Sequence, residues 1–266
     1  MKDAGKRQSI FKLPTISWAI YDLANTIFSL AILSFFFPLW ITRENGGVSS
    51  AEYALTVAIS MLAAAAILPI LGAISDTYGK RIPFLRIFVI ICVGCTALLG
   101  QSQSMILPLI LFAIANFAYQ SAEVFYNALL PQVSSAENRG LVSGFGVGIG
   151  YIGSILTIIL LAPLATAEGA DESATFLPTA ILYIIIALPL FFAIRERRPN
   201  ERKFDWRIIV DAYKQLFSTL KNIKQNKNLF QFIMARFFYL DAINTLIAFM
   251  AIYVTTILGE DVAKTE

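Results

Sequence analysis

Long uninterrupted apolar runs dominate this chain of 266 residues and restrict what it can fold into. Hydrophobic residues make up 57% of the sequence and charged residues 15%, whereas soluble domains usually carry about a quarter charged residues. A helix needs roughly 20 mostly apolar residues to cross a bilayer, while a strand of a membrane barrel needs only about 10 with alternating character. The run lengths therefore predict an all-α polytopic membrane protein. The expected spans are residues 16–41, 51–75, 83–103, 105–130, 141–165, 176–194 and 229–258.

Basic residues concentrate in alternate segments between these runs. Eighteen of the 21 Lys and Arg residues lie before the first run or around the segments after the second, fourth and sixth runs. The positive-inside rule assigns such segments to the cytoplasm. We therefore expect a cytoplasmic N-terminus in the plasma (inner) membrane, or in a vacuolar membrane if the cell is eukaryotic. Because topology accounts for the basic residues, no nucleic-acid partner is predicted.

The runs divide the chain into three expected regions. Residues 1–195 form an N-terminal six-helix transmembrane bundle. In residues 196–228, apolar side chains from Trp206 to Ile223 recur at helical spacing among lysines, which is typical of a basic amphipathic helix at the cytoplasmic interface. Residues 229–266 contain helix 7. This is the layout of two parallel six-helix repeats, and the second repeat is expected to be cut off after its first helix.

The first and seventh runs contain the same polar pattern. Asp22 and Asn25 lie in the first run, and Asp241 and Asn244 lie at the same spacing in the seventh. A charged side chain at the centre of a membrane helix costs roughly 2.5–3.5 kcal/mol on insertion scales, so it should face protein or water. These four residues are candidates for substrate or ion coupling. The structural alternative is capping and pairing, for example of Asp241 with Arg236.

The fourth run carries Asn116, Gln120, Glu123 and Asn127 at spacings of three and four residues. This spacing places the four polar side chains on one face of a helix. They are candidates for lining a cavity, with Glu123 as a proton-coupling group. Hydrogen bonding between helices is the structural alternative.

The loop after the second run holds Gly72, Asp76, Gly79, Lys80 and Arg81. Gly72 is expected to permit close helix packing and Gly79 to permit a tight turn. Lys80 and Arg81 suit the level of the lipid headgroups, and Asp76 is expected to cap a helix start or to pair with them.

Glycines recur every two to four residues at the start of the fifth run, from Gly140 to Gly153. Small residues at such spacing let a neighbouring membrane helix approach closely. We therefore expect this stripe to be a packing surface.

The sequence predicts no metal, cofactor or catalytic residue. It contains no histidine, and Cys92 and Cys95 form a lone pair inside an apolar run, where they are expected to pack as small apolar residues. Tyr21-Asp22 matches half of an intramembrane aspartyl protease site, but the Gly-x-Gly-Asp partner is missing. A seven-helix receptor is disfavoured because the N-terminus is expected inside the cell.

The loop spacing Gly-x-x-x-Asp-x-x-Gly-Lys-Arg resembles the signature loop of the major facilitator superfamily, although Thr77 stands where a basic residue is common. Residues 17–25, 124–131 and 140–153 resemble the autophagy-related vacuolar effluxer group and its prokaryotic relatives. The most specific stretch reads Val-Phe-Tyr-Asn-Ala-Leu-Leu-Pro. The resemblance implies a transporter of about twelve helices whose halves alternate access, with the signature loop latched against helix 11. Eukaryotic members of the group are associated with amino-acid efflux from vacuoles.

The predicted function is secondary active transport of a small polar solute, as a permease or effluxer, with a coupled proton or cation. Amino acids are one substrate class that the resemblance implies. The alternative is a truncated, non-transporting fragment, since alternating access needs two repeats around one site. Activity would then depend on the missing C-terminal half or on self-association within the lipid bilayer.

A cysteine introduced next to Lys221 tests the predicted orientation. We expect a membrane-impermeant maleimide to leave it unlabelled in intact cells and to label it after lysis, because the basic segment is predicted to be cytoplasmic. The chain with only Cys92 and Cys95 gives the background. Labelling in intact cells would reverse the orientation and remove the argument for parallel repeats.

Overall fold

The computed structural model describes residues 12–42, 48–101, 106–194 and 227–263, together with residue 196 and a few positions between 210 and 222. All regular elements in this part of the chain are helical. They are α1 (Leu13–Phe28), the π-helical η1 (Ser29–Phe35), α2 (Phe36–Thr42), α3 (Ser50–Tyr78), α4 (Ile82–Leu98), the 3₁₀ turn η2 (Leu99–Gln101), α5 (Ile106–Ala128), α6 (Leu130–Val133), α7 (Arg139–Ala165), the 3₁₀ turn η3 (Glu172–Thr175), α8 (Phe176–Ala193) and α10 (Lys227–Ala263).

The six expected N-terminal spans are confirmed as helical segments long and apolar enough to cross a membrane. The first of them is α1, η1 and α2 joined end to end. The seventh expected run, residues 229–258, lies within the helix α10, and its role as a span stays a prediction. Most of the expected linker, residues 196–228, lies outside the described residues.

Local signals in the sequence set the ends of the helices that frame the site. Pro14 occupies the first turn of α1, where its missing N–H costs nothing. At the start of α3, the Ser49 side chain accepts from the Glu52 N–H at 3.2 Å, and the Glu52 carboxylate accepts from the Ser49 N–H at 2.8 Å. This reciprocal capping box satisfies two otherwise unpaired backbone donors.

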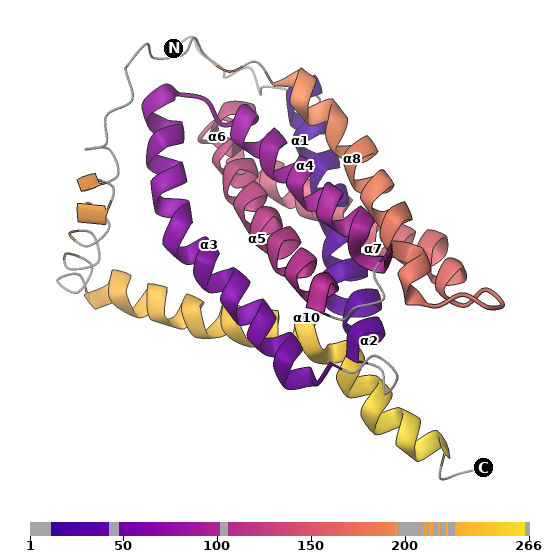
Figure 1. The fold of residues 1–266 in the computed structure, drawn as a ribbon. Helices are drawn as coiled ribbons and strands as arrows, with labels where there is room; N and C mark the ends of the chain where they lie inside the picture. The colour runs from indigo at the N-terminus through magenta and orange to yellow at the C-terminus, as the bar shows by residue number, and fades with distance from the viewer. Residues whose placement is uncertain are drawn as a thin grey trace, which may run out of the picture.

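Helix α1 lies at the centre of the bundle. It packs along both α7 and α8, while α4 lies between α5 and α8 and α3 packs on α5. Figure 1 shows α3 on the outer side of α5, and α10 crossing near the start of α3 and near α2. The Phe249 ring of α10 meets the Tyr53 ring of α3 edge-on, with centroids 5.8 Å apart.

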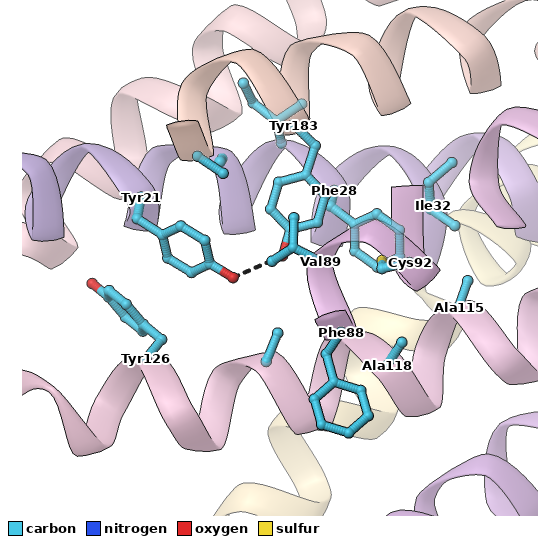
Figure 2. Close-up of a cluster of buried hydrophobic side chains, with 14 of the residues drawn as sticks. Tyr21, Phe28, Ile32, Phe88, Val89, Cys92, Ala115, Ala118, Tyr126 and Tyr183 are labelled. Carbon is cyan, nitrogen blue, oxygen red and sulfur yellow. Dashed lines mark hydrogen bonds between the residues drawn. The ribbon is translucent and has the colours of Figure 1, made fainter. Parts of the chain in front are cut away.

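Aromatic side chains fill the space around α1. Figure 2 shows Tyr21 and Phe28 of α1 among Tyr183 of α8, Tyr126 of α5 and Phe88 of α4. The Phe28 and Tyr183 rings stack with centroids 5.6 Å apart. Since lipid is as apolar as a protein core, close van der Waals packing of this kind and hydrogen bonds hold membrane helices together.

The glycine stripe of α7 is confirmed as a packing surface, and its partner is α1. A Cβ atom built on Gly146 would lie 2.6 Å from the Trp18 ring, and one on Gly153 would lie 2.6 Å from the Leu23 carbonyl oxygen. Gly150 faces Asp22 in the same way. Gly140, Gly144 and Gly148 meet nothing within 4 Å among the described residues. Only one side of the stripe is therefore used for the close approach.

Substitution of Gly153 by alanine is expected to destabilise the bundle. The added methyl group would press on the backbone of α1, and such overpacking typically costs about 1–3 kcal/mol. Gly148→Ala makes the same chemical change in open space and is the matched control. The measurement is the midpoint of thermal unfolding of the purified protein in detergent. Equal midpoints for both variants would contradict the α1–α7 packing.

Candidate functional site

A chain of hydrogen bonds joins three helices at the centre of the bundle. The Asn25 side-chain amide of α1 donates to Glu123 Oε1 of α5. The Tyr183 hydroxyl of α8 donates to Asn25 Oδ1 at 3.0 Å. The hydroxyls of Tyr21 and Tyr183 lie 3.2 Å apart. Figure 2 marks this second contact with a dashed line. Asn25 is almost fully buried, and its amide uses both its donor and its acceptor here.

These contacts fix the direction of the chain. Tyr183 has one hydroxyl proton, and the carbonyl oxygen of the Asn25 amide can only accept. The proton of Tyr183 therefore goes to Asn25, and Tyr21 must donate to Tyr183. Every donor in this chain is thus oriented toward the Glu123 carboxyl group.

A second side-chain amide, that of Asn127, donates a hydrogen bond to Glu123. Asn127, one turn further along α5, donates to Glu123 Oε2 at 3.0 Å and to the Glu123 carbonyl oxygen at 2.9 Å. Because both carboxyl oxygens accept an N–H, the arrangement suits an ionised carboxylate. The Asn127 side chain is exposed. It joins the other polar residues predicted on this run through its hydrogen bond to Glu123.

Asp22 faces a different neighbour from Asn25, although the sequence places them one turn apart. A Cβ built on Gly150 of α7 would lie 2.9 Å from Asp22 Oδ2, which shows how closely the carboxylate packs on that helix. The Tyr126 hydroxyl of α5 is buried without a hydrogen-bond partner among the described residues. Asp22 thus lies in the contact between α1 and α7.

A cavity of about 250 Å³ lies next to Glu123, between η1, α3 and α5. Three of the four polar residues predicted on the fourth run, Asn116, Gln120 and Glu123, line it. Asn116 also hydrogen-bonds across to Ser60 of α3 at 2.7 Å, so the structural alternative applies to that contact. The described lining residues are Ser29, Leu33, Tyr53, Val57, Met61, Phe112, Asn116, Tyr119, Gln120 and Glu123.

The second copy of the polar pattern lies in α10. Asp241 and Asn244 fall within this helix, but their side chains lie outside the described part of the structure. Arg236, one turn earlier, is exposed. Most of the described contacts of α10 are with η1 and α2, besides the Phe249–Tyr53 ring contact with α3, and the coupling role of Asp241 and Asn244 stays a prediction.

The loop between α3 and α4 turns where the sequence predicts. Gly79 adopts the left-handed conformation, with φ of 64°, which ends α3 without the strain of a Cβ atom. The Lys80 N–H closes the turn on the Ser75 carbonyl oxygen at 3.2 Å. The expected close packing at Gly72 is not found, because a Cβ there would meet no described atom within 4 Å.

Arg81 ties this loop to the rest of the bundle. Its guanidinium pairs with Asp76 at 3.0 Å and donates to the Ala128 carbonyl oxygen at the end of α5 at 2.6 Å. Asp76 therefore pairs with a basic residue and does not cap α4. Glu196 takes the capping position, since its carboxylate accepts from the N–H groups of Arg81 and Ile82.

Sequence reasoning missed several residues of this site. Tyr183 and Ser60 lie in apolar runs without any charged neighbour that would mark them, and Tyr53 follows Glu52, which the sequence uses at the start of α3. One signal was available, because a tyrosine buried in a membrane helix needs a partner for its hydroxyl group. Glu196 was counted with the polar linker, although it contacts the start of α4.

Together these features define a polytopic helical membrane protein with a polar network and a cavity between its helices. The family model described as Major Facilitator Superfamily matches residues 23–265. The chain belongs to this superfamily of membrane transporters, as the signature loop predicts.

Two curated relatives resemble it over most of its length. One is an uncharacterised MFS-type transporter, YxiO, of Bacillus subtilis (strain 168), with 32% identity over 254 residues. The other is an uncharacterised protein of Aquifex aeolicus (strain VF5), with 28% identity over 247 residues. The alignments cover 89% and 91% of this chain but 59% and 57% of the relatives. The chain therefore spans less than two thirds of the length of either protein.

Replacement of Tyr183 by phenylalanine tests the hydrogen-bond chain. It removes the donor to Asn25 and the acceptor for Tyr21, which leaves buried polar groups unsatisfied at a cost of about 1–3 kcal/mol. Tyr151→Phe, at a position that is 70% exposed, is the matched control. We expect a lower midpoint of thermal unfolding for Tyr183→Phe alone. Unchanged midpoints for both variants would exclude an energetic role for the chain.

Proposed function

We propose that this chain takes part in secondary active transport of a small polar solute by alternating access. The observation that carries the proposal is the cavity beside Glu123, whose carboxylate is held by amides of α1 and α5. Transporters bind solutes near the middle of the bilayer, at sites formed between helices. An ionisable side chain in such a place is a functional candidate by default.

The hydrogen bonds supply a means of coupling. A proton on Glu123 would turn one of its accepting oxygens into a donor, and the amide that donates to that oxygen would lose its acceptor. Through Asn25, this change reaches Tyr183 and therefore α8. We propose that Glu123 and Asp22 couple solute movement to a proton or cation in this way.

The remaining parts of the proposal follow the sequence predictions. The solute class includes amino acids, as the resemblance to the vacuolar effluxer group implies. Asp241 and Asn244 supply the corresponding groups of the second repeat. The N-terminus lies in the cytoplasm, and the protein resides in the plasma membrane. The loop held by Arg81 acts as a conformational latch, and transport involves no catalytic step.

The test uses the purified chain in proteoliposomes that contain a pH-sensitive dye. A panel of small polar solutes, amino acids included, is added outside, and proton movement is recorded. We expect at least one solute to drive proton movement, and Asp22→Asn to reduce the rate at least tenfold while the protein still inserts. Asp211→Asn, at an exposed position far along the chain, is the matched control.

Two outcomes would count against the proposal. Wild-type rates in Asp22→Asn would remove Asp22 from the coupling mechanism. If no solute moves protons through a correctly inserted chain, the alternative of a non-transporting fragment is favoured, since the second repeat is then required.

A further inference from the structure

The Asn116 side chain leaves one atom of the cavity wall unsatisfied. The Ser60 hydroxyl donates its proton to the Val57 carbonyl oxygen at 2.7 Å, so it can only accept from Asn116 Nδ2, also at 2.7 Å. This contact fixes the orientation of the amide. Asn116 is 1% exposed, and its Oδ1 atom is buried without a hydrogen-bond partner among the described residues.

An unsatisfied buried acceptor costs about 1–3 kcal/mol, and native proteins rarely keep one without a reason. Asn116 lines the cavity, so an occupant that carries an N–H or O–H group would supply the missing donor. A carboxylate or phosphate oxygen would instead be repelled by Oδ1. The cavity wall therefore favours an occupant with a hydrogen-bond donor next to Asn116 Oδ1.

The charge of the cavity points the same way. Glu123 lies on the same face of α5, seven residues or about 10 Å from Asn116 along the helix. Its contacts are with the neutral amides of Asn25 and Asn127. Among the described residues that line the cavity there is no lysine or arginine, so no described side chain of the wall balances the carboxylate. A buried charge needs an opposite charge, which a cationic occupant would provide.

The rest of the lining suits the body of such a solute. Tyr53, Phe112 and Tyr119 present aromatic surface, which attracts both apolar groups and cations. The volume of about 250 Å³ lies below the roughly 300–1,000 Å³ of sites for drug-sized ligands, so the solute must be compact.

We propose that this cavity selects a small organic cation, a protonated amine with an apolar body, over solutes that carry a carboxylate, so that within the proposed class of small polar solutes amines bind more tightly than amino acids. Glu123 binds the ammonium group, and Asn116 Oδ1 accepts from a further N–H or O–H group of the solute. As a substrate specificity, this inference rests on the proposed transport function; as a binding preference, it is tested independently.

The experiment compares four probes that share a phenyl ring and a short chain. They are 2-phenylethylamine, 2-phenylethanol, 3-phenylpropionate and phenylalanine, titrated into the chain in lipid nanodiscs at pH 7 by calorimetry. We expect the amine to bind at least tenfold more tightly than the alcohol, and the two carboxylates to bind more weakly than the amine. This comparison uses the wild-type protein and depends on no variant.

Variants then locate the site. Glu123→Gln is expected to weaken binding of the amine at least tenfold, whereas Glu137→Gln, the same change in an exposed loop, leaves it unchanged. Asn116→Leu is expected to weaken binding severalfold and to keep the preference for the amine. The midpoint of thermal unfolding confirms that each variant is folded.

The outcomes separate this inference from the transport proposal. Equal or tighter binding of phenylalanine or phenylpropionate, insensitivity to Glu123→Gln, or no binding of any probe to the folded chain would each overturn the amine assignment. None of these results affects solute-driven proton movement in proteoliposomes. Conversely, amine binding that depends on Glu123 would stand even if the liposomes show no proton movement.

Discussion

The bundle depends on the side chain of Asn25, which satisfies the polar groups of three helices at once. Its amide joins Glu123 of α5 to Tyr183 of α8, and its own helix supplies Tyr21 at the far end of the chain. Buried polar groups between membrane helices have few other partners, so each group left unpaired would cost about 1–3 kcal/mol. The network therefore ties the arrangement of α1, α5 and α8 to the presence of all its members.

The close approach of α1 and α7 gives Asp22 its place. Gly146, Gly150 and Gly153 let the backbone of α7 reach Trp18, Asp22 and Leu23 without intervening side chains. Trp18 in turn stacks on Tyr126 with centroids 4.6 Å apart and donates its indole N–H to the Tyr126 carbonyl oxygen at 3.1 Å. One face of α1 thus packs against the glycines of α7, while the adjoining face carries the polar network.

The sequence predicted the helices well and their contacts only in part. Run length and hydropathy determine the spans, and the i, i+4, i+7 spacing brought Asn116, Gln120 and Glu123 to one cavity. Which helix each polar face would meet depends on the three-dimensional packing, which is not encoded in any single segment. For this reason the link from Asn25 to Tyr183, 158 residues later, could not be predicted. Close packing at Gly72 is not seen among the described residues, because the pattern of small residues does not say which of them meets a neighbour.

The π-helical segment η1 explains how one helix serves both the network and the cavity. A π turn has i→i+5 hydrogen bonding, so it holds one residue more than an α turn and rotates the following residues by about 100°. The Ser34 hydroxyl bonds to the Ser29 carbonyl oxygen, five residues earlier, at 3.0 Å, and the Tyr53 hydroxyl of α3 donates to the Leu33 carbonyl oxygen at 3.1 Å. Ser29 and Leu33, four and eight residues after Asn25, line the cavity. The polar network and the cavity wall are therefore parts of one continuous helix, and a change in its packing reaches both.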